Sequence, residues 1–540
     1  MNRRQLFSIL FLAVFFALSL FCSERGYDLE QIRARAEAFD REITLSWYET
    51  DNYGKSSRLT EIYQAYEDLF SDPGLIQFVR DKMEQEQEPR ERRRLEYLLK
   101  YLIEEYAGLR AGELDDLILD IQAQEELELR EQTVAFRDVG GELFNSSDRQ
   151  WRQELFQARG ELIVSKINPL LRQRLEIQME TCQQFGYDDY ADFQVRAHHT
   201  DFDRLAQLCE ELLYQTELIY RELVTETANR VLGLPLQEVQ PYDRPRLFRG
   251  QDFDGYFPPE RMVPLLQETL TEMGIDLTRQ DNIDLDVEDR PEKEPRPACY
   301  IISVPDDIRV LVKPLGGAED YESLFHEMGH AEHYAHVQAT DYEFRILGED
   351  GVTESFAFLF ENLFMDPKFL ESKMNMPADV ARSYIRQALM ADLSSLRYYC
   401  GLFLFERALH SGAEDPSWIY RDLWERARLT RMSLPQAEAS YLIANEDFYS
   451  VGYLEAWLLE AQIREKLRQD YGAYWFSDPR TGQLLKDLWV LGSEKPVVEL
   501  AQELGYDALD AGPLRRETER LFHYARGTSP LMNRETAGKL

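Results

Sequence analysis

His326-Glu327-Met328-Gly329-His330 is the stretch of this 540-residue sequence that says most about its fold and its chemistry. On a helix, His326 and His330 lie four residues apart on one face, so two imidazole nitrogens can reach one divalent ion. Glu327 lies one step round the helix, where its carboxylate is free to act as a general base on water bound to that ion. The pentapeptide therefore predicts a zinc site on a helix.

A zinc enzyme of this type needs a third protein ligand and an open fourth position. The segment 351–361 runs apolar at helical spacing, and Glu354 is the carboxylate near its start. Glu361 lies seven residues later on nearly the same face, because two helical turns are about 7.2 residues. We expect Glu354 to bind the metal, with one zinc ion per chain. We expect Glu361 to orient one of the metal ligands without binding the metal itself. A solvated or salt-bridged carboxylate is the other interpretation of Glu361.

Further histidines lie near the motif. His333 is about 10 Å from His326 along a helix, at about 1.5 Å per residue, so one ion cannot easily be reached from both. We expect His333 either to contact one of the metal ligands without binding the metal, or to lie in the core. His336 is expected at the surface or in the core, and the pair His198-His199 is expected to be structural.

A β-hairpin is predicted just before the zinc helix. Residues 301–304 and 308–312 are rich in β-branched residues, and Pro305-Asp306-Asp307 joins them as a turn. The edge of this hairpin could pair with the main chain of an extended peptide, which would favour broad specificity. A hairpin that only covers the core is the alternative.

These features together resemble the thimet oligopeptidase and oligoendopeptidase F family of zinc metallopeptidases. The likeness includes the HExGH motif, the 28 residues from His326 to Glu354, the hairpin region 297–317 and the tyrosine-rich segment 448–457. Angiotensin-converting enzyme and its relatives have a similar motif and spacing. The likeness covers roughly residues 180–520 and is strong only near the zinc site.

The resemblance implies a mainly α fold. It would be a large, two-lobed helical peptidase that encloses a deep groove, with a small hairpin or sheet beside the zinc helix. Proline clusters place the boundary between an N-terminal helical lobe, 23–240, and a catalytic lobe, 241–540. Residues 27 to about 232 read as almost wholly helical, and 125–129 reads as a charged helix surface.

Tyr453 and Tyr449 are the candidate catalytic donors to the oxyanion. They lie four residues apart, so one helix face would carry both hydroxyls, and the resemblance favours Tyr453. The sequence departs from the family at two points. There is no histidine between His410 and His523, and Ser355-Phe356-Ala357 follows the glutamate ligand where the family has another context.

The predicted function is zinc-dependent hydrolysis of internal bonds in short peptides. A peptidyl-dipeptidase or carboxypeptidase on the same scaffold is one alternative, for which Arg309 or Lys313 would hold the terminal carboxylate. A non-catalytic surface peptide-binding protein is another. The residues that bind substrate are unknown from sequence alone. A net charge of −38 makes nucleic acid an unfavourable partner, and we expect a monomer.

The N-terminus predicts export. Arg3-Arg4 precede an apolar run, 6–21, of 16 residues, which is short for a membrane span and typical of a signal sequence. Residues 1–22 are therefore expected to be a signal peptide or a lipoprotein leader. A lipid anchor at Cys22, cleavage after Ser19 and an uncleaved anchor remain open. The expected location is the periplasm or the cell surface, with membrane contact only through this leader.

Overall fold

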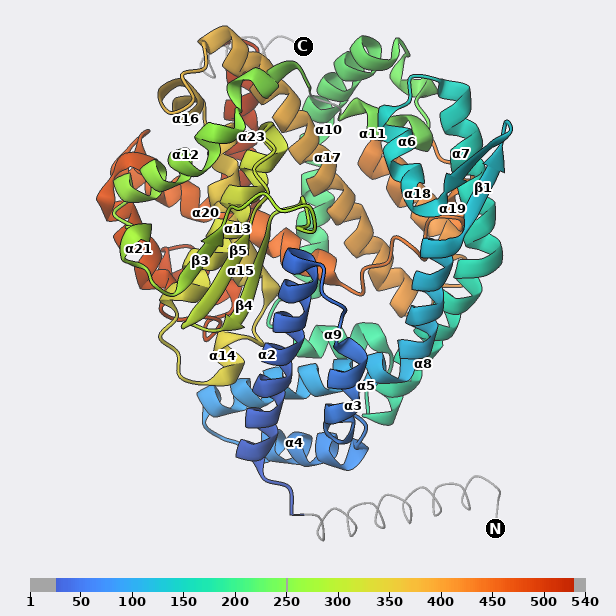
Figure 1. Cartoon of the computed structure of the whole chain (residues 1–540), viewed down its shortest axis with the longest axis vertical. Coiled ribbons are helices and arrows are strands. Elements are labelled where there is room, and N and C mark those ends of the chain that lie inside the picture. Colours follow the sequence, from blue (N-terminus) through green and yellow to red (C-terminus); the bar gives the residue numbers. More distant parts are fainter. Residues whose placement is uncertain (1–25, 249–250, 529–540) are drawn as a thin grey trace.

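The computed structural model describes residues 26–248 and 251–528 (Figure 1). The fold is mainly helical with two small sheets, which confirms the predicted class. The expected leader, 1–22, and the candidate lipid anchor at Cys22 lie outside the described residues. Among the described helices, none combines the length and the apolar character needed to span a bilayer.

The N-terminal part of the chain is built from helices and one short hairpin. Its elements are α2 (Leu29–Tyr53), α3 (Leu59–Phe70), α4 (Pro73–Gln85), α5 (Pro89–Gln124), β1 (Glu126–Leu129), β2 (Gln132–Ala135), α6 (Val139–Asn145), α7 (Arg149–Leu162), α8 (Asn168–Gln184), α9 (Tyr190–Ala197) and α10 (Phe202–Leu232).

The remainder contains the second sheet and the helices that carry the predicted site. Its elements are α11 (Arg244–Leu247), α12 (Pro259–Glu272), β3 (Ile283–Asp286), β4 (Ala298–Ser303), β5 (Asp307–Leu311), α13 (Ala318–His336), α14 (Tyr342–Arg345), α15 (Asp350–Glu361), α16 (Pro367–Ser372), α17 (Ala378–His410), α18 (Pro416–Arg428), α19 (Leu434–Glu438), α20 (Tyr449–Tyr471), α21 (Pro479–Trp489), α22 (Val497–Glu503) and α23 (Ala511–Ala525).

The hairpin predicted before the helix of the HExGH motif is confirmed. β4 and β5 pair antiparallel, with Cys299 opposite Val310. The sequence analysis missed β3, which pairs parallel to β5 and gives the strand order β3-β5-β4. β4 is thus an edge strand of this sheet. Helix α13 packs against β4 and β5, and α2 packs against β4, so the sheet supports the helix that carries the histidines.

The prediction of a charged helix surface at 125–129 is wrong. Residues 126–129 form β1, which pairs with β2 through a tight turn at Arg130 and Glu131. Both turn residues have positive φ, 50° and 62°, as a two-residue hairpin turn requires. The alternating Glu-Leu-Glu-Leu pattern has the period of a strand, with Leu127 buried, and this period was missed.

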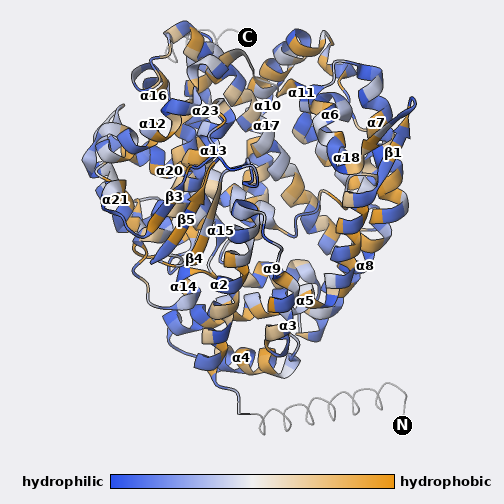
Figure 2. Cartoon of the chain, viewed as in Figure 1, coloured by the Kyte–Doolittle hydropathy of each residue, from blue (hydrophilic) through white to orange (hydrophobic). Residues whose placement is uncertain are grey.

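One large hydrophobic core joins both parts of the chain. It includes residues of α2, α5 and α10 together with residues of α13, α15, α17 and α20. Helix α10, before position 240, packs directly against α17, after it. The helices mix hydrophobic and hydrophilic residues along their length, as amphipathic helices around a core do (Figure 2). A division into lobes at residue 240 stays a prediction.

Candidate metal centre

A close helix crossing brings the predicted ligands together. Gly329, in the middle of the α13 motif, lies against α15 so tightly that an added Cβ would be 2.5 Å from Ala357 Cα and 2.6 Å from Phe356 O. Only a residue without a side chain permits this approach. The glycine of the HExGH motif therefore has a packing function: it lets α15 come near enough for its carboxylate to reach the histidines.

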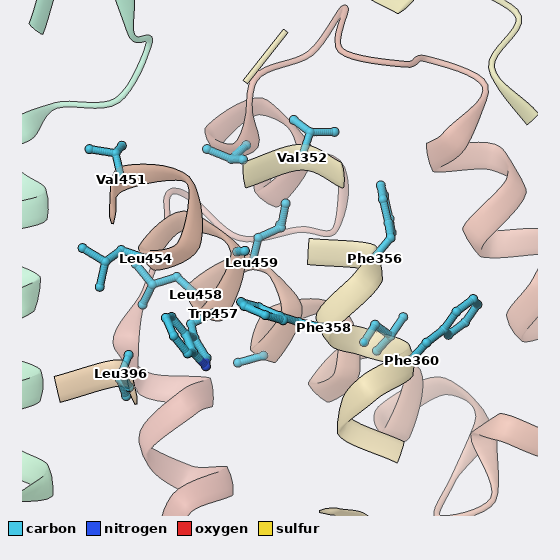
Figure 3. Close-up of a cluster of buried hydrophobic side chains, with 14 of the residues drawn as sticks. Val352, Phe356, Phe358, Phe360, Leu396, Val451, Leu454, Trp457, Leu458 and Leu459 are labelled. Carbon is cyan, nitrogen blue, oxygen red and sulfur yellow. The ribbon is translucent and has the colours of Figure 1, made fainter. Parts of the chain in front are cut away.

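Helix α15 is held on its other side by α20. Apolar side chains of the two helices belong to one core, and Figure 3 shows Phe358 of α15 lying beside Trp457 of α20. The rings of Phe358 and Trp457 have centroids 5.0 Å apart. Because α15 is buried along almost its whole length, its position and rotation are set by packing on two sides.

His326, His330 and Glu354 meet at one point. The Nε2 atoms of the two histidines are 3.2 Å apart. Glu354 Oε2 lies 3.5 Å from His326 Nε2 and 3.7 Å from His330 Nε2. Among the described residues this is the group of three or more such side chains whose donor atoms all lie within 4.8 Å of one another.

Two hydrogen bonds orient the imidazole rings. His326 Nδ1 lies 2.8 Å from Glu361 Oε2, so the ring donates its Nδ1 hydrogen to the carboxylate. His330 Nδ1 lies 2.8 Å from Thr353 Oγ1. With Nδ1 protonated on each ring, both Nε2 lone pairs face the same point as Glu354 Oε2. Sequence reasoning missed Thr353; its place one residue before Glu354 was the available signal.

This arrangement fits a tetrahedral divalent ion such as zinc. Ligand bonds of about 2.0–2.2 Å imply ligand-to-ligand distances of roughly 3.3–3.6 Å, close to the three distances above. Glu354 Oε2 is buried and has no hydrogen-bond partner among the described residues. Two lone pairs and a carboxylate oxygen facing one another repel unless a cation lies between them. The donor set, two imidazoles and one carboxylate, is also one that zinc accepts.

The pKa values of the site follow from burial and from these contacts. Burial lowers the pKa of His326, but the hydrogen bond and the charge of Glu361 outweigh it and raise the value to about 9. Burial raises the pKa of Glu354 to about 7. Burial drives the pKa of His330 well below its usual value. The low pKa of His330 leaves this ring neutral and able to bind a cation, whereas a cation at His326 and Glu354 would displace protons.

Glu327 lies beside the triad and lines a cavity of about 390 Å³ together with His326, Glu361 and Tyr453. Burial raises the pKa of Glu327, which suits a group that accepts and returns a proton. Arg296, which sequence reasoning also missed, lines the same cavity and is exposed. Its guanidinium has no ion pair among the described residues.

The two predicted tyrosines occupy different positions. Tyr449 OH donates a hydrogen bond to Glu354 Oε1 at 3.2 Å, so this hydroxyl is engaged by a predicted metal ligand. Tyr453 lines the cavity beside Glu327, and its ring stacks on Phe358 at 5.7 Å. The two rings are 4.9 Å apart and nearly perpendicular. Of the two, Tyr453 is the one that lines the same cavity as Glu327.

A buried glutamate that was not predicted fixes the start of α20. Asp447 and Phe448, just before Tyr449, have positive φ of 53° and 70°. Glu406 accepts hydrogen bonds there from the main-chain amides of Glu446 and Phe448, at 2.8 and 3.3 Å. It also bonds the hydroxyl of Ser450. This network holds an unfavourable backbone conformation that aims Tyr449 at the triad.

Other predicted residues lie away from the site. His333 is buried against Phe356, 5.1 Å between ring centroids, and its ring nitrogens have no hydrogen-bond partner among the described residues. His333 thus lies in the core, which is one of the two positions expected for it. Arg309 forms an ion pair with Asp307 at 2.8 Å, and Lys313 lies 3.4 Å from Asp289.

Comparison with known proteins does not assign the chain to a family. No protein-family profile matches the chain, and no curated protein is significantly similar to it in sequence.

Proposed function

We propose that this chain is a zinc-dependent oligopeptidase that hydrolyses internal bonds of short peptides, and that it is a divergent member of the thimet oligopeptidase and oligoendopeptidase F family. The observation that carries the proposal is the convergence of His326 Nε2, His330 Nε2 and the unpartnered Glu354 Oε2 beside Glu327. The HExGH motif and the tyrosine-rich segment support the family assignment. A deep groove between two helical lobes, which would admit only short or unfolded peptides, is part of the same proposal.

His326, His330 and Glu354 would hold the ion, which when bound supplies a Lewis acid that polarises a carbonyl and lowers the pKa of water to about 7. Glu327 takes a proton from water as the new C–O bond forms at the peptide carbonyl. It then delivers that proton to the amine nitrogen as the C–N bond breaks. Tyr453 donates a hydrogen bond to the oxyanion without adding a charge.

An enzyme that removes short C-terminal pieces is the second candidate. It needs a cation to hold the terminal carboxylate, and Arg296 in the catalytic cavity is the observation that favours it. The residues first considered for this role, Arg309 and Lys313, already have acidic partners. Product analysis on a defined peptide separates internal from terminal cleavage.

The deciding experiment combines metal analysis with peptide cleavage. We expect about one zinc per purified chain, and turnover of a fluorogenic peptide library that a chelator abolishes and zinc restores. Glu327→Gln should lose turnover but keep its zinc, because Glu327 is not a ligand. Absence of both stoichiometric metal and turnover would overturn the proposal and would favour the non-catalytic peptide-binding protein.

A further inference from the structure

A second cavity, of about 320 Å³, lies next to the candidate metal centre and is not used by the mechanism above. Its walls come from α5, α8, α9, the first residue of α15 and the start of α20. Tyr449 lines this cavity and also donates a hydrogen bond to Glu354. One residue therefore contacts both the second cavity and a predicted metal ligand.

The cavity has an excess of carboxylates. Of its two cations, Arg174 is already paired with Asp447 at 2.7 Å and with Asp115 at 3.2 Å. Lys100 is left facing three further carboxylates in the wall, those of Glu104, Asp350 and Glu446. Glu104 accepts a hydrogen bond from Gln194 Nε2 at 3.1 Å. Lys100 and these three carboxylates sum to a net charge of about −2 when all are ionised.

Several of these polar groups have no partner within the protein. Gln178 is 7% exposed, lines the cavity, and its amide forms no hydrogen bond among the described residues. Over the same described ranges, the carboxylates of Asp350 and Glu446 form no hydrogen bond or ion pair. A buried amide without a partner is costly, so its presence at a cavity wall points to a ligand that completes it. Acidic acceptors together with an amide suit a cationic group that donates hydrogen bonds.

The distance from the triad sets what could reach this place. Asp350 precedes Glu354 by four residues, about 6 Å along a helix at about 1.5 Å per residue. An extended peptide covers about 3.3–3.6 Å per residue, so about two residues span the gap. A peptide with its scissile bond at the triad would place the end of a short N-terminal piece in the cavity.

We propose that this second cavity binds the N-terminal ammonium group of the peptide substrate, through Glu104, Asp350 and the amide of Gln178. The proposal rests on the peptidase function above and replaces cleavage at internal bonds in general by cleavage at one position: the substrates are short peptides with a free N-terminus, cleaved about two residues from that end.

Binding to the metal-free protein tests the cavity separately from catalysis. Calorimetric titration compares alanyl-alaninamide, which has the ammonium group and no carboxylate, with N-acetyl-alanyl-alanine, which has the reverse. We expect the first to bind at least about tenfold more tightly, as charged hydrogen bonds of this kind contribute. Equal binding, or preference for the acetylated dipeptide, would overturn the proposal.

Variants with opposite expected effects guard against loss of fold. Glu104→Gln keeps the size of the side chain and should weaken binding of the ammonium dipeptide by about tenfold. Lys100→Met removes a like charge and should strengthen it. Glu113→Gln, at an exposed position of the same helix, is the matched control and should change nothing. Loss of N-acetyl-alanyl-alanine binding in Lys100→Met, without stronger ammonium binding, would show that the cavity takes a carboxylate instead.

Hydrolysis assays then separate the two proposals. In the zinc-loaded enzyme, N-acetylation of a substrate should raise KM at least about tenfold, and Glu104→Gln should remove most of that difference. Turnover that is equal for free and acetylated peptides would refute the ammonium site and leave the peptidase function standing. Preferential binding of alanyl-alaninamide without any hydrolysis would refute the peptidase function and leave the ammonium site standing.

Discussion

Replacing Gly329 by alanine should separate the two helices that build the candidate metal centre. The added Cβ would lie 2.5 Å from Ala357 Cα and 2.6 Å from Phe356 O, both main-chain atoms of α15 that no rotamer change can move. Carbon atoms in contact normally lie about 3.5–4.0 Å apart, so α13 and α15 must move apart by about 1 Å. Glu354 lies one helical turn from this contact and would move with α15.

Two measurable effects follow from this displacement. Overpacking of this kind costs about 1–3 kcal/mol of unfolding free energy. Sites of this type tolerate displacements of about 0.5 Å, so zinc affinity should fall by at least about a hundredfold. Denaturant unfolding measures the first effect, and competition with a chromogenic chelator measures the second.

Gly112→Ala is the matched control for this change. Gly112 also lies within a helix, α5, but an added Cβ there meets no atom within 4 Å. Alanine at this position should stabilise the protein by about 0.5–1 kcal/mol and leave zinc binding unchanged. If Gly329→Ala bound zinc with the affinity of the natural chain, the close crossing would not be what brings Glu354 to the histidines.

Three further predictions test the site and its support. Glu361→Gln loses the carboxylate that fixes His326, so zinc affinity should fall about 10–100-fold by chelator competition; unchanged affinity would contradict this. Tyr453→Phe should lower kcat by about 10²–10³-fold with little change in zinc content, and a kcat within a fewfold of the natural enzyme would exclude Tyr453 as the oxyanion donor. Burial raises the pKa of Asp286, but the hydrogen bonds that its carboxylate accepts outweigh this effect and hold the pKa below its usual value. One of the donors, Lys293, is buried. Asp286→Asn should therefore cost about 3 kcal/mol in denaturant unfolding at pH 7. The carboxylate gives its full stabilisation above the pKa of the unfolded chain, about 3.9, and loses it progressively as the pH falls toward the lower pKa of the folded state. The difference should therefore shrink below pH 4, and a loss that does not depend on pH would contradict this.

The sequence by itself determined the local features of this protein. The spacing of His326 and His330 placed both on one helix face, because a helix repeats every 3.6 residues. The β-branched runs on either side of Pro305 were enough to predict the hairpin of β4 and β5. Both results depend only on residues near one another in the chain.

The tertiary structure alone decided how separate elements meet. Periodicity shows that Glu354 and Glu361 share a helix face, but only the crossing at Gly329 decides that Glu354 faces both imidazoles while Glu361 bonds the far side of one. The same packing turned Tyr449 toward Glu354 and left Tyr453 in the cavity. The physical reason is that a helix fixes directions around its own axis, whereas distances between helices depend on the side chains that pack at each crossing.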